Sequence, residues 1–199
     1  RLVALISLLV VTTTVFSQIA NNWTFGYHTG LNFATNPTTF FADSISSNDC
    51  YNSSSLSSIG AYASNNISDC NGNLLFYTNG NVVWNKNHQL MPNSCLNDTI
   101  PGGAGNEMKI KILKLINNDS LYYIFYTTKQ SGLRYAIVNL SADNGNGDII
   151  SPNNFINSFY IGPSTKLVYP PELIKHNNDT DYWLVCKPKD NSMYSYLIT

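Results

Sequence analysis

The segment 74–85 constrains the fold of this chain more than any other. Two β-prone runs, 74–78 and 81–85, flank the dipeptide Asn79-Gly80, which best tolerates the two positive φ angles of a type I′ turn. The pattern therefore predicts a hairpin with a two-residue turn. In the register of that turn, Tyr77 faces Val82 and Leu75 faces Trp84 on one side, and Phe76 faces Val83 on the other.

Both faces of this hairpin are apolar, whereas a strand with one solvated face alternates apolar and polar residues. Such a hairpin needs a sheet packed against each side, as between the stacked blades of a β-propeller. Related runs recur downstream, and aligning Leu75, Ile124 and Trp183 gives a repeat of about 50 to 60 residues. We therefore expect an all-β, β-propeller-like domain over residues 18–199, with about three antiparallel blades of an incomplete propeller that continues beyond residue 199.

The remaining pattern is also that of strands and turns. Residues 23–33 predict a short first hairpin around Gly30, and residues 36–58 predict a long surface loop. Residues 59–63 are a candidate strand leading into the central hairpin, and residues 93–106 predict a second loop. The later strands expected are 108–116, 121–127, 133–140 and 148–150 in one meander, then 173–176, 182–187 and 193–198 in the next.

Residues 1–17 resemble a signal peptide. An apolar run, 2–16, follows Arg1 and precedes Ser17-Gln18, with Val15 and Ser17 at the positions that a signal peptidase reads. The run is shorter than the ~20 residues of a membrane-spanning helix. We expect cleavage before Gln18, a secreted or cell-surface location and no transmembrane segment after the signal peptide.

Export permits disulfides among Cys50, Cys70, Cys95 and Cys186, and the sequence leaves their pairing open, with a buried free thiol as the alternative for Cys186. Only 12% of the 199 residues are charged and the net charge is −1. The 11 basic residues are scattered, which argues against a nucleic-acid partner because phosphate binding needs clustered Lys and Arg.

Motifs for cofactors and metals are incomplete. The loop Gly102 to Gly105 is not followed by the Gly-Lys-Ser/Thr of a phosphate-binding loop, so no cofactor is predicted. Asp69, Asn71 and Asn73, and the segment 143–148, place oxygen side chains at spacings that resemble calcium loops. Both lack the full ligand set and are explained by Asn-Gly turns, so we predict no metal site and leave calcium binding at these turns open.

No catalytic set can be assembled either. The only glutamates are Glu107 and Glu172, and His28, His88 and His176 have no recognisable nucleophile motif beside them. Trp23, Trp84 and Trp183 have the rings to stack on sugars, but apolar neighbours favour core positions for the last two. We predict no catalytic residue, and a non-enzymatic scaffold or binding module that recognises glycan or protein through rim loops 36–58 and 93–106. The alternative is an extracellular hydrolase or lyase, directed at glycan or peptide, with Asp49, Glu107 or Glu172 contributed from loops.

Segment 68–93, which reads SDCNGNLLFYTNGNVVWNKNHQLMPN, resembles a region near the N-terminus of secreted Bacteroidota surface proteins. Residues 121–126, 132–135, 144–148 and 175–183 follow in the order of that family, so the resemblance covers most of residues 23–199. It implies a β-propeller-like region followed by further extracellular modules and a C-terminal domain for type IX secretion or associated with gliding motility. It carries no catalytic motif. Asn79 replaces the family's usual aspartate, and residues 101–107 replace its Ser/Thr/Gln-rich segment.

Overall fold

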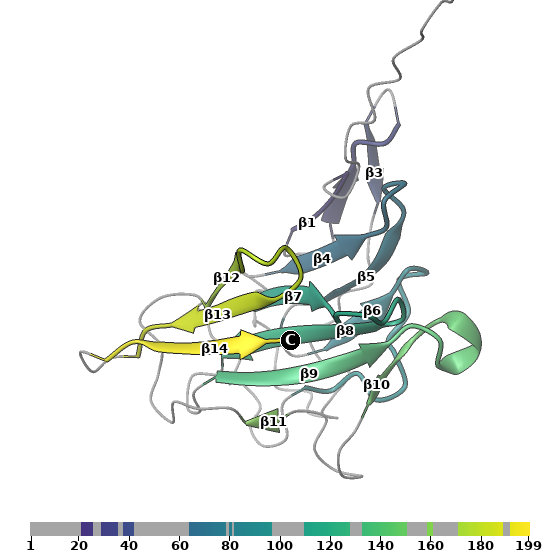
Figure 1. Cartoon of the computed structure of the whole chain (residues 1–199). Coiled ribbons are helices and arrows are strands. Elements are labelled where there is room, and N and C mark those ends of the chain that lie inside the picture. Colours follow the sequence, from purple (N-terminus) through teal and green to yellow (C-terminus); the bar gives the residue numbers. More distant parts are fainter. Residues whose placement is uncertain are drawn as a thin grey trace, which may run out of the picture.

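The structure is a computed structural model of the chain, and it describes residues 21–25, 29–35, 38–41, 64–78, 80, 82–96, 110–127, 133–150, 159–160, 171–188 and 192–199. These residues are all-β, as expected. Their strands form four antiparallel sheets, none of which closes on itself, and a single 3-10 turn is the only helical element described (Figure 1). Among the described residues, no helix has the length and apolar character needed to cross a membrane.

The first two sheets are small. In each of them the strands pair in the order in which they follow one another along the chain. Sheet I contains β1 (Asn22–Phe25), β2 (Thr29–Asn32) and β3 (Thr39–Phe41), and sheet II contains β4 (Asn65–Ser68), β5 (Leu74–Thr78) and β6 (Val83–Asn85).

The other two sheets carry the longest strands. The meander expected from the sequence is confirmed as sheet III, in which four consecutive strands pair and a short fifth strand, β11, pairs with β9. Sheet III contains β7 (Ile110–Lys114), β8 (Leu121–Thr127), β9 (Leu133–Asn139), β10 (Asp148–Ile150) and β11 (Phe159–Tyr160), and sheet IV contains β12 (Glu172–Lys175), β13 (Tyr182–Cys186) and β14 (Tyr194–Ile198).

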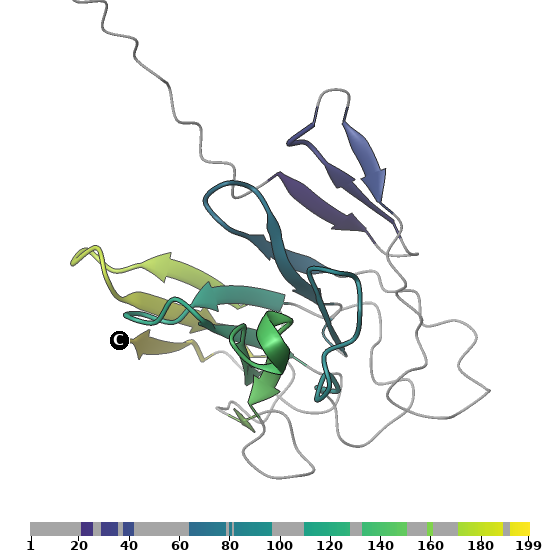
Figure 2. The ribbon, with the colours of Figure 1, turned by 90° about the vertical axis from the view of Figure 1, so that its right-hand side faces the viewer.

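Sheet III has an apolar core on each of its faces. Strand β8 alternates, so that Tyr122, Ile124 and Tyr126 point toward sheet II, where Phe76 meets Tyr122 edge to face at 5.5 Å. Phe125 points the other way and joins a second core with Leu184 of sheet IV. Sheets II, III and IV therefore follow one another face to face (Figure 2).

Polar contacts link the first strands of these three sheets. The Asn65 amide donates to the carbonyl of Ile110 at 3.1 Å, and Lys111 forms a 2.8 Å ion pair with Glu172. Each contact joins the beginning of one strand to the beginning of the next. In Figure 1, β4 and β7 point the same way and β13 points the opposite way, so β12, which is antiparallel to β13, runs in the same direction as β4 and β7. Sheet I differs, because contacts from Asn22 to Ser68 and from Thr24 to Ser64 make β1 antiparallel to β4.

The hairpin of sheet II differs from the predicted type I′ form. Its register pairs Thr78 with Val83 and Tyr77 with Trp84, two residues away from the expected pairing. The reason is the Thr78 hydroxyl, which donates to the carbonyl of Val82 at 2.7 Å and accepts from the Gly80 amide at 2.9 Å. Thr78 therefore pairs with Val83, so four positions separate the paired residues where two were expected. A shift of two preserves the faces, so Tyr77 and Trp84 still lie opposite Phe76 and Val83.

Other strand positions predicted from the sequence differ from those in the structure. Strand β3 lies inside the segment 36–58 that was expected to be a loop, and β4 lies beyond the candidate strand 59–63. The alignment of Trp183 with Ile124 was wrong by one residue, because Ile124 faces the preceding sheet whereas Trp183 faces away from it. Residues 1–17 and 97–109 lie outside the described residues, as do 42–63 and 161–170.

Candidate functional site

The candidate site is the end of the sheets at which the described turns gather. It is called here the turn end. Because β4, β7 and β12 run in the same direction, the turns that follow them emerge at the same end, and antiparallel pairing returns β6 and β9 to it. The turn end comprises residues 69–73, 85–89, 115–120, 139–147 and 176–181.

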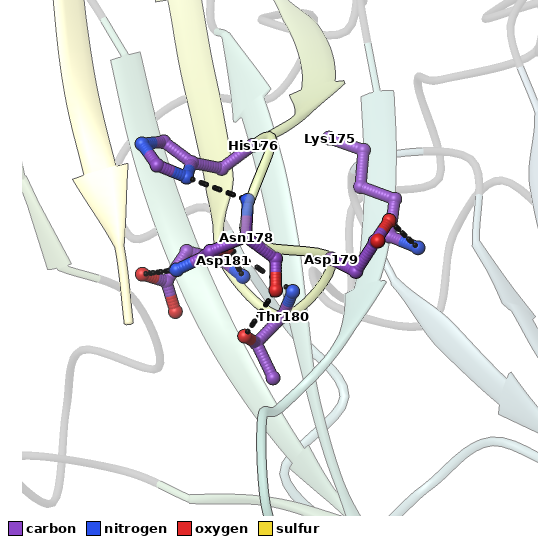
Figure 3. Close-up of polar contacts among 6 residues, drawn as sticks. All are labelled: Lys175, His176, Asn178, Asp179, Thr180 and Asp181. Carbon is purple, nitrogen blue, oxygen red and sulfur yellow. Dashed lines mark hydrogen bonds and ion pairs between the residues drawn. The ribbon is translucent and has the colours of Figure 1, made fainter.

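Asparagine and aspartate side chains hold these turns. In the turn between β12 and β13, the Asn178 side-chain oxygen accepts from the amides of Thr180 at 3.1 Å and Asp181 at 3.0 Å (Figure 3). The Asn178 amide group donates to the Asp181 carboxylate at 2.7 Å. Bonds of this kind form an Asx turn, which explains why a short polar segment reverses the chain here.

The same turn is built in sheet III. Asn118 accepts from the amides of Ser120 and Leu121 at 2.9 and 3.1 Å, as Asn178 does for the residues at the matching positions. Each turn also has an ion pair, Lys114 with Asp119 at 2.6 Å and Lys175 with Asp179 at 3.1 Å. Segments 114–123 and 175–183 thus share the run Asn-Asn-Asp-Ser/Thr with a Tyr two positions after it, and a Lys stands three positions before the run in the first segment and two before it in the second. Sequence reasoning missed this repeat, although the signal was present.

In sheet II, Asp69 has the corresponding role. Its Oδ1 accepts from the amides of Asn71 at 2.9 Å and Asn73 at 2.8 Å, and its Oδ2 accepts from the Asn73 side chain at 2.8 Å. These bonds, the one from the Asn73 side chain first, lower the pKa of Asp69. Both carboxylate oxygens therefore face N–H donors, and a calcium ion would have to displace them. In the second calcium candidate, segment 143–148, both carboxylate oxygens of Asp148 also face N–H donors. Asp148 accepts two hydrogen bonds from Asn93, each 2.8 Å long.

His88 lies beside an aromatic pair at this end. Tyr77 stacks on Trp84 with ring centroids 5.3 Å apart, and the Tyr77 hydroxyl lies 3.2 Å from Nδ1 of His88. Partial burial lowers the pKa of His88, so its neutral form is favoured. Trp84 is 0% exposed, and its indole N–H has no hydrogen-bond partner among the residues that the structure describes. The prediction that Trp84 is a core residue is confirmed, and its ring cannot stack on a sugar.

The other two tryptophans lie nearer the surface. Trp23 is 53% exposed and meets Phe33 edge to face at 5.3 Å. Trp183 is half-buried beside His176, at a ring distance of 5.8 Å, and lies on the outward face of sheet IV. The expectation of a core position is therefore only partly met for Trp183.

The candidate catalytic residues either lie apart from one another or fall outside the residues that the structure describes. Glu172 stands on β12, paired with Lys111, and His176 uses Nδ1 to accept from the Asn178 amide at 3.2 Å. In the part of the chain that is described, no three His, Cys, Asp or Glu side chains gather as a metal-binding group. His28, Asp49, the Gly102 to Gly105 loop and Glu107 lie outside the described residues.

The described cysteines include one disulfide-bonded residue and two free thiols. Cys95 is disulfide-bonded, whereas Cys70 is an exposed thiol and Cys186 a buried one. The alternative of a buried free thiol is thus the one that the structure shows for Cys186, and Cys50 lies outside the described residues. Burial raises the pKa of Cys186 to about 11, so this thiol is unsuited to nucleophilic chemistry near neutral pH.

In comparisons with known proteins, no family model, no curated protein and no solved structure matches the chain.

Proposed function

We propose that this chain is a non-enzymatic scaffold or binding module of a secreted or cell-surface bacterial protein, which recognises glycan or protein through loops at the rim of a β-propeller-like domain. The observation that carries the proposal is the face-to-face succession of sheets II, III and IV with their first strands running in the same direction. Such a framework holds loops at its two ends on rigid strands, which suits recognition.

The propeller-like arrangement is supported by how the sheets meet. The first strand of each blade in a propeller lies nearest the axis, so first strands of successive blades come close together. In sheets II to IV these strands are joined by polar contacts, Asn65 to Ile110 and Lys111 to Glu172, while apolar cores fill the spaces between sheet faces. Sheets II, III and IV would then be three blades of the propeller, and sheet I would be an additional sheet that packs next to sheet II.

An extracellular location is supported by the disulfide at Cys95. Disulfides persist in oxidising environments and are rare in the cytosol. The apolar run 2–16 and the resemblance of segment 68–93 to secreted Bacteroidota proteins favour the same location.

The two ends of the sheets are not equivalent for binding. At the turn end, the short turns direct much of their hydrogen bonding inward, as Asp69 and Asn178 do. The opposite end is where β4, β7 and β12 begin, and they are entered by the long connections 42–63, 97–109 and 161–170, which lie outside the described residues. Longer connections tolerate more sequence variation, so we place the ligand-binding rim at that end.

The experiment is a binding screen of the intact secreted protein on a glycan array and against proteins of the same cell surface. We expect saturable binding without product formation. Replacing residues 97–106 with a Gly-Ser linker should abolish binding while the melting temperature changes little. The control is Asp179→Ala at the turn end, which should bind as well as the wild type.

Turnover distinguishes the competing class of function. A hydrolase or lyase would release products from polysaccharide or peptide libraries, and its rate would fall in Glu107→Gln or Glu172→Gln. Product release that either substitution eliminates would overturn the scaffold proposal, as would the failure of every glycan and surface protein to bind.

A further inference from the structure

The outward face of sheet IV carries a row of apolar side chains, next to the polar Glu172 and Ser195 that pair with Val185. Strand pairing places Ile174, Trp183 and Leu197 in one row across β12, β13 and β14, with Val185 beside it. Ile174 is 53% exposed and Leu197 is 45% exposed, while Trp183 and Val185 are half-buried. This set of four residues is called here the outward row. Large adjacent apolar side chains left in water on a sheet face are characteristic of an interaction surface.

The same positions of sheet III are covered. The shared turn motif aligns Tyr123 with Trp183 and Phe125 with Val185, and strand pairing places Leu113 where sheet IV has Ile174. In sheet III these three residues lie in the core formed with sheet IV, where Leu113 is 7% and Phe125 2% exposed. The outward row is therefore the counterpart of a surface whose covering partner is known.

We propose that the outward row is the docking surface for a further antiparallel sheet of the same repeat, which packs on sheet IV as sheet IV packs on sheet III. The two existing interfaces define the chemistry of the occupant. Sheet III offers Tyr122 and Ile124 to sheet II, and sheet IV offers Tyr182 and Leu184 to sheet III. The middle strand of the further sheet presents Tyr and, two residues later, Leu or Ile.

This inference does not depend on ligand recognition by the rim loops, because it concerns a different surface and would hold for a scaffold that bound nothing. It does depend on the face-to-face packing of sheets III and IV. A second copy of this chain offers no such match in the described part, since the inward faces of sheets III and IV, which carry the Tyr-x-Ile and Tyr-x-Leu pairs, are already buried.

The test measures how fast a maleimide labels single cysteines in the protein isolated from its source organism and in the chain ending at Thr199. Leu197→Cys and Ile174→Cys report on the outward row, and Thr180→Cys, in an exposed turn, is the control. The exposed Cys70 is replaced by Ser in all variants. We expect the outward-row cysteines to react about 10-fold or more slowly in the isolated protein than in the chain ending at Thr199, and the control to react equally in both.

Two outcomes would overturn the proposal. Equal labelling of Leu197→Cys in both forms would show that nothing covers the face. Protection that falls on dilution, together with a dimeric mass by light scattering, would assign the face to a second copy. Loss of glycan or protein binding with labelling unchanged would affect the proposed function alone, so the two failures are distinguishable.

Discussion

At the scale of single residues, burial and hydrogen bonding give chemically similar side chains different roles. Cys70 and Cys186 are both free thiols, yet one is exposed and the other lies between two sheets. Trp84 is enclosed on all sides while Trp23 is half exposed. These contrasts provide matched pairs for experiment, because each pair differs mainly in environment.

Trp84→Ala is expected to reduce the free energy of unfolding by about 3 to 5 kcal/mol, the range for removing a large buried aromatic side chain. Within the described part of the chain the indole N–H makes no hydrogen bond, so the loss comes from packing, including the stacked ring of Tyr77. Urea denaturation followed by circular dichroism measures it. Trp23→Ala should cost much less, and equal losses for the two variants would contradict the burial described here.

Cys70 and Cys186 should react at very different rates with iodoacetamide at pH 8. Burial raises the pKa of Cys186 to about 11 from its ordinary 9.0, which lowers its thiolate population by about 100-fold. Cys70 is exposed to the reagent. Mass spectrometry after timed alkylation should find Cys70 modified first and Cys186 modified only in denaturant. Rapid native modification of Cys186 would show that sheets III and IV do not enclose it.

Asp69 should titrate below its ordinary value of 3.8, because hydrogen bonds from Asn73 and its neighbours lower its pKa. A carboxyl group with a lowered folded-state pKa contributes stability above its unfolded pKa and loses it as the pH falls through the folded pKa. Carbon-13 NMR of the carboxyl group gives the midpoint directly. Asn73→Ala should bring the midpoint back toward 3.8, and an unshifted wild-type midpoint would exclude the proposed bonding.

At the scale of elements, the pattern of apolar and polar residues predicted which segments are strands better than it predicted where each strand begins and ends. The meander of β7 to β10 was recoverable because each strand is mostly apolar and flanked by polar turns. Strand β4 was missed because Asn65-Asn-Ile-Ser68 is polar: its Asn65 and Asn66 side chains bond to Ile110 and Thr24 of neighbouring sheets. The hairpin register failed for a related reason, since the hydroxyl of Thr78 rather than Asn79-Gly80 alone determines the turn.

The turn after β9 contains two glycines that differ in their surroundings. Gly145 and Gly147 have φ values of +85° and +90°, which strain any other residue by roughly 1 to 2 kcal/mol. A Cβ at Gly147 would lie 2.9 Å from the buried Met91 side chain, whereas at Gly145 no described atom lies within 4 Å of it. Gly147→Ala should therefore destabilise the protein more than Gly145→Ala in thermal denaturation. The reverse order would mean that this turn does not pack on Met91.

At the scale of the whole molecule, the sequence predicted two-faced strands but not the order in which the sheets meet. The apolar faces of segment 74–85 and of β8 require neighbours on both sides, and the structure supplies them as sheets II, III and IV. Contacts such as Lys111 with Glu172 join residues far apart in the chain, and no local pattern specifies them. The candidate site was less predictable still: the Asn-Asn-Asp-Ser/Thr run is present in the sequence and indicates a turn, but its position at the same end of sheets III and IV follows only from the directions of the strands.

The most direct test of the central claim, the face-to-face succession of sheets, is a nuclear Overhauser measurement between aromatic rings across one interface. The rings of Phe76 in sheet II and Tyr122 in sheet III are 5.5 Å apart and should give a strong cross-peak, with further peaks from Phe125 to the methyl groups of Leu184 between sheets III and IV. Assigned resonances for these residues without cross-peaks across either interface would contradict the account.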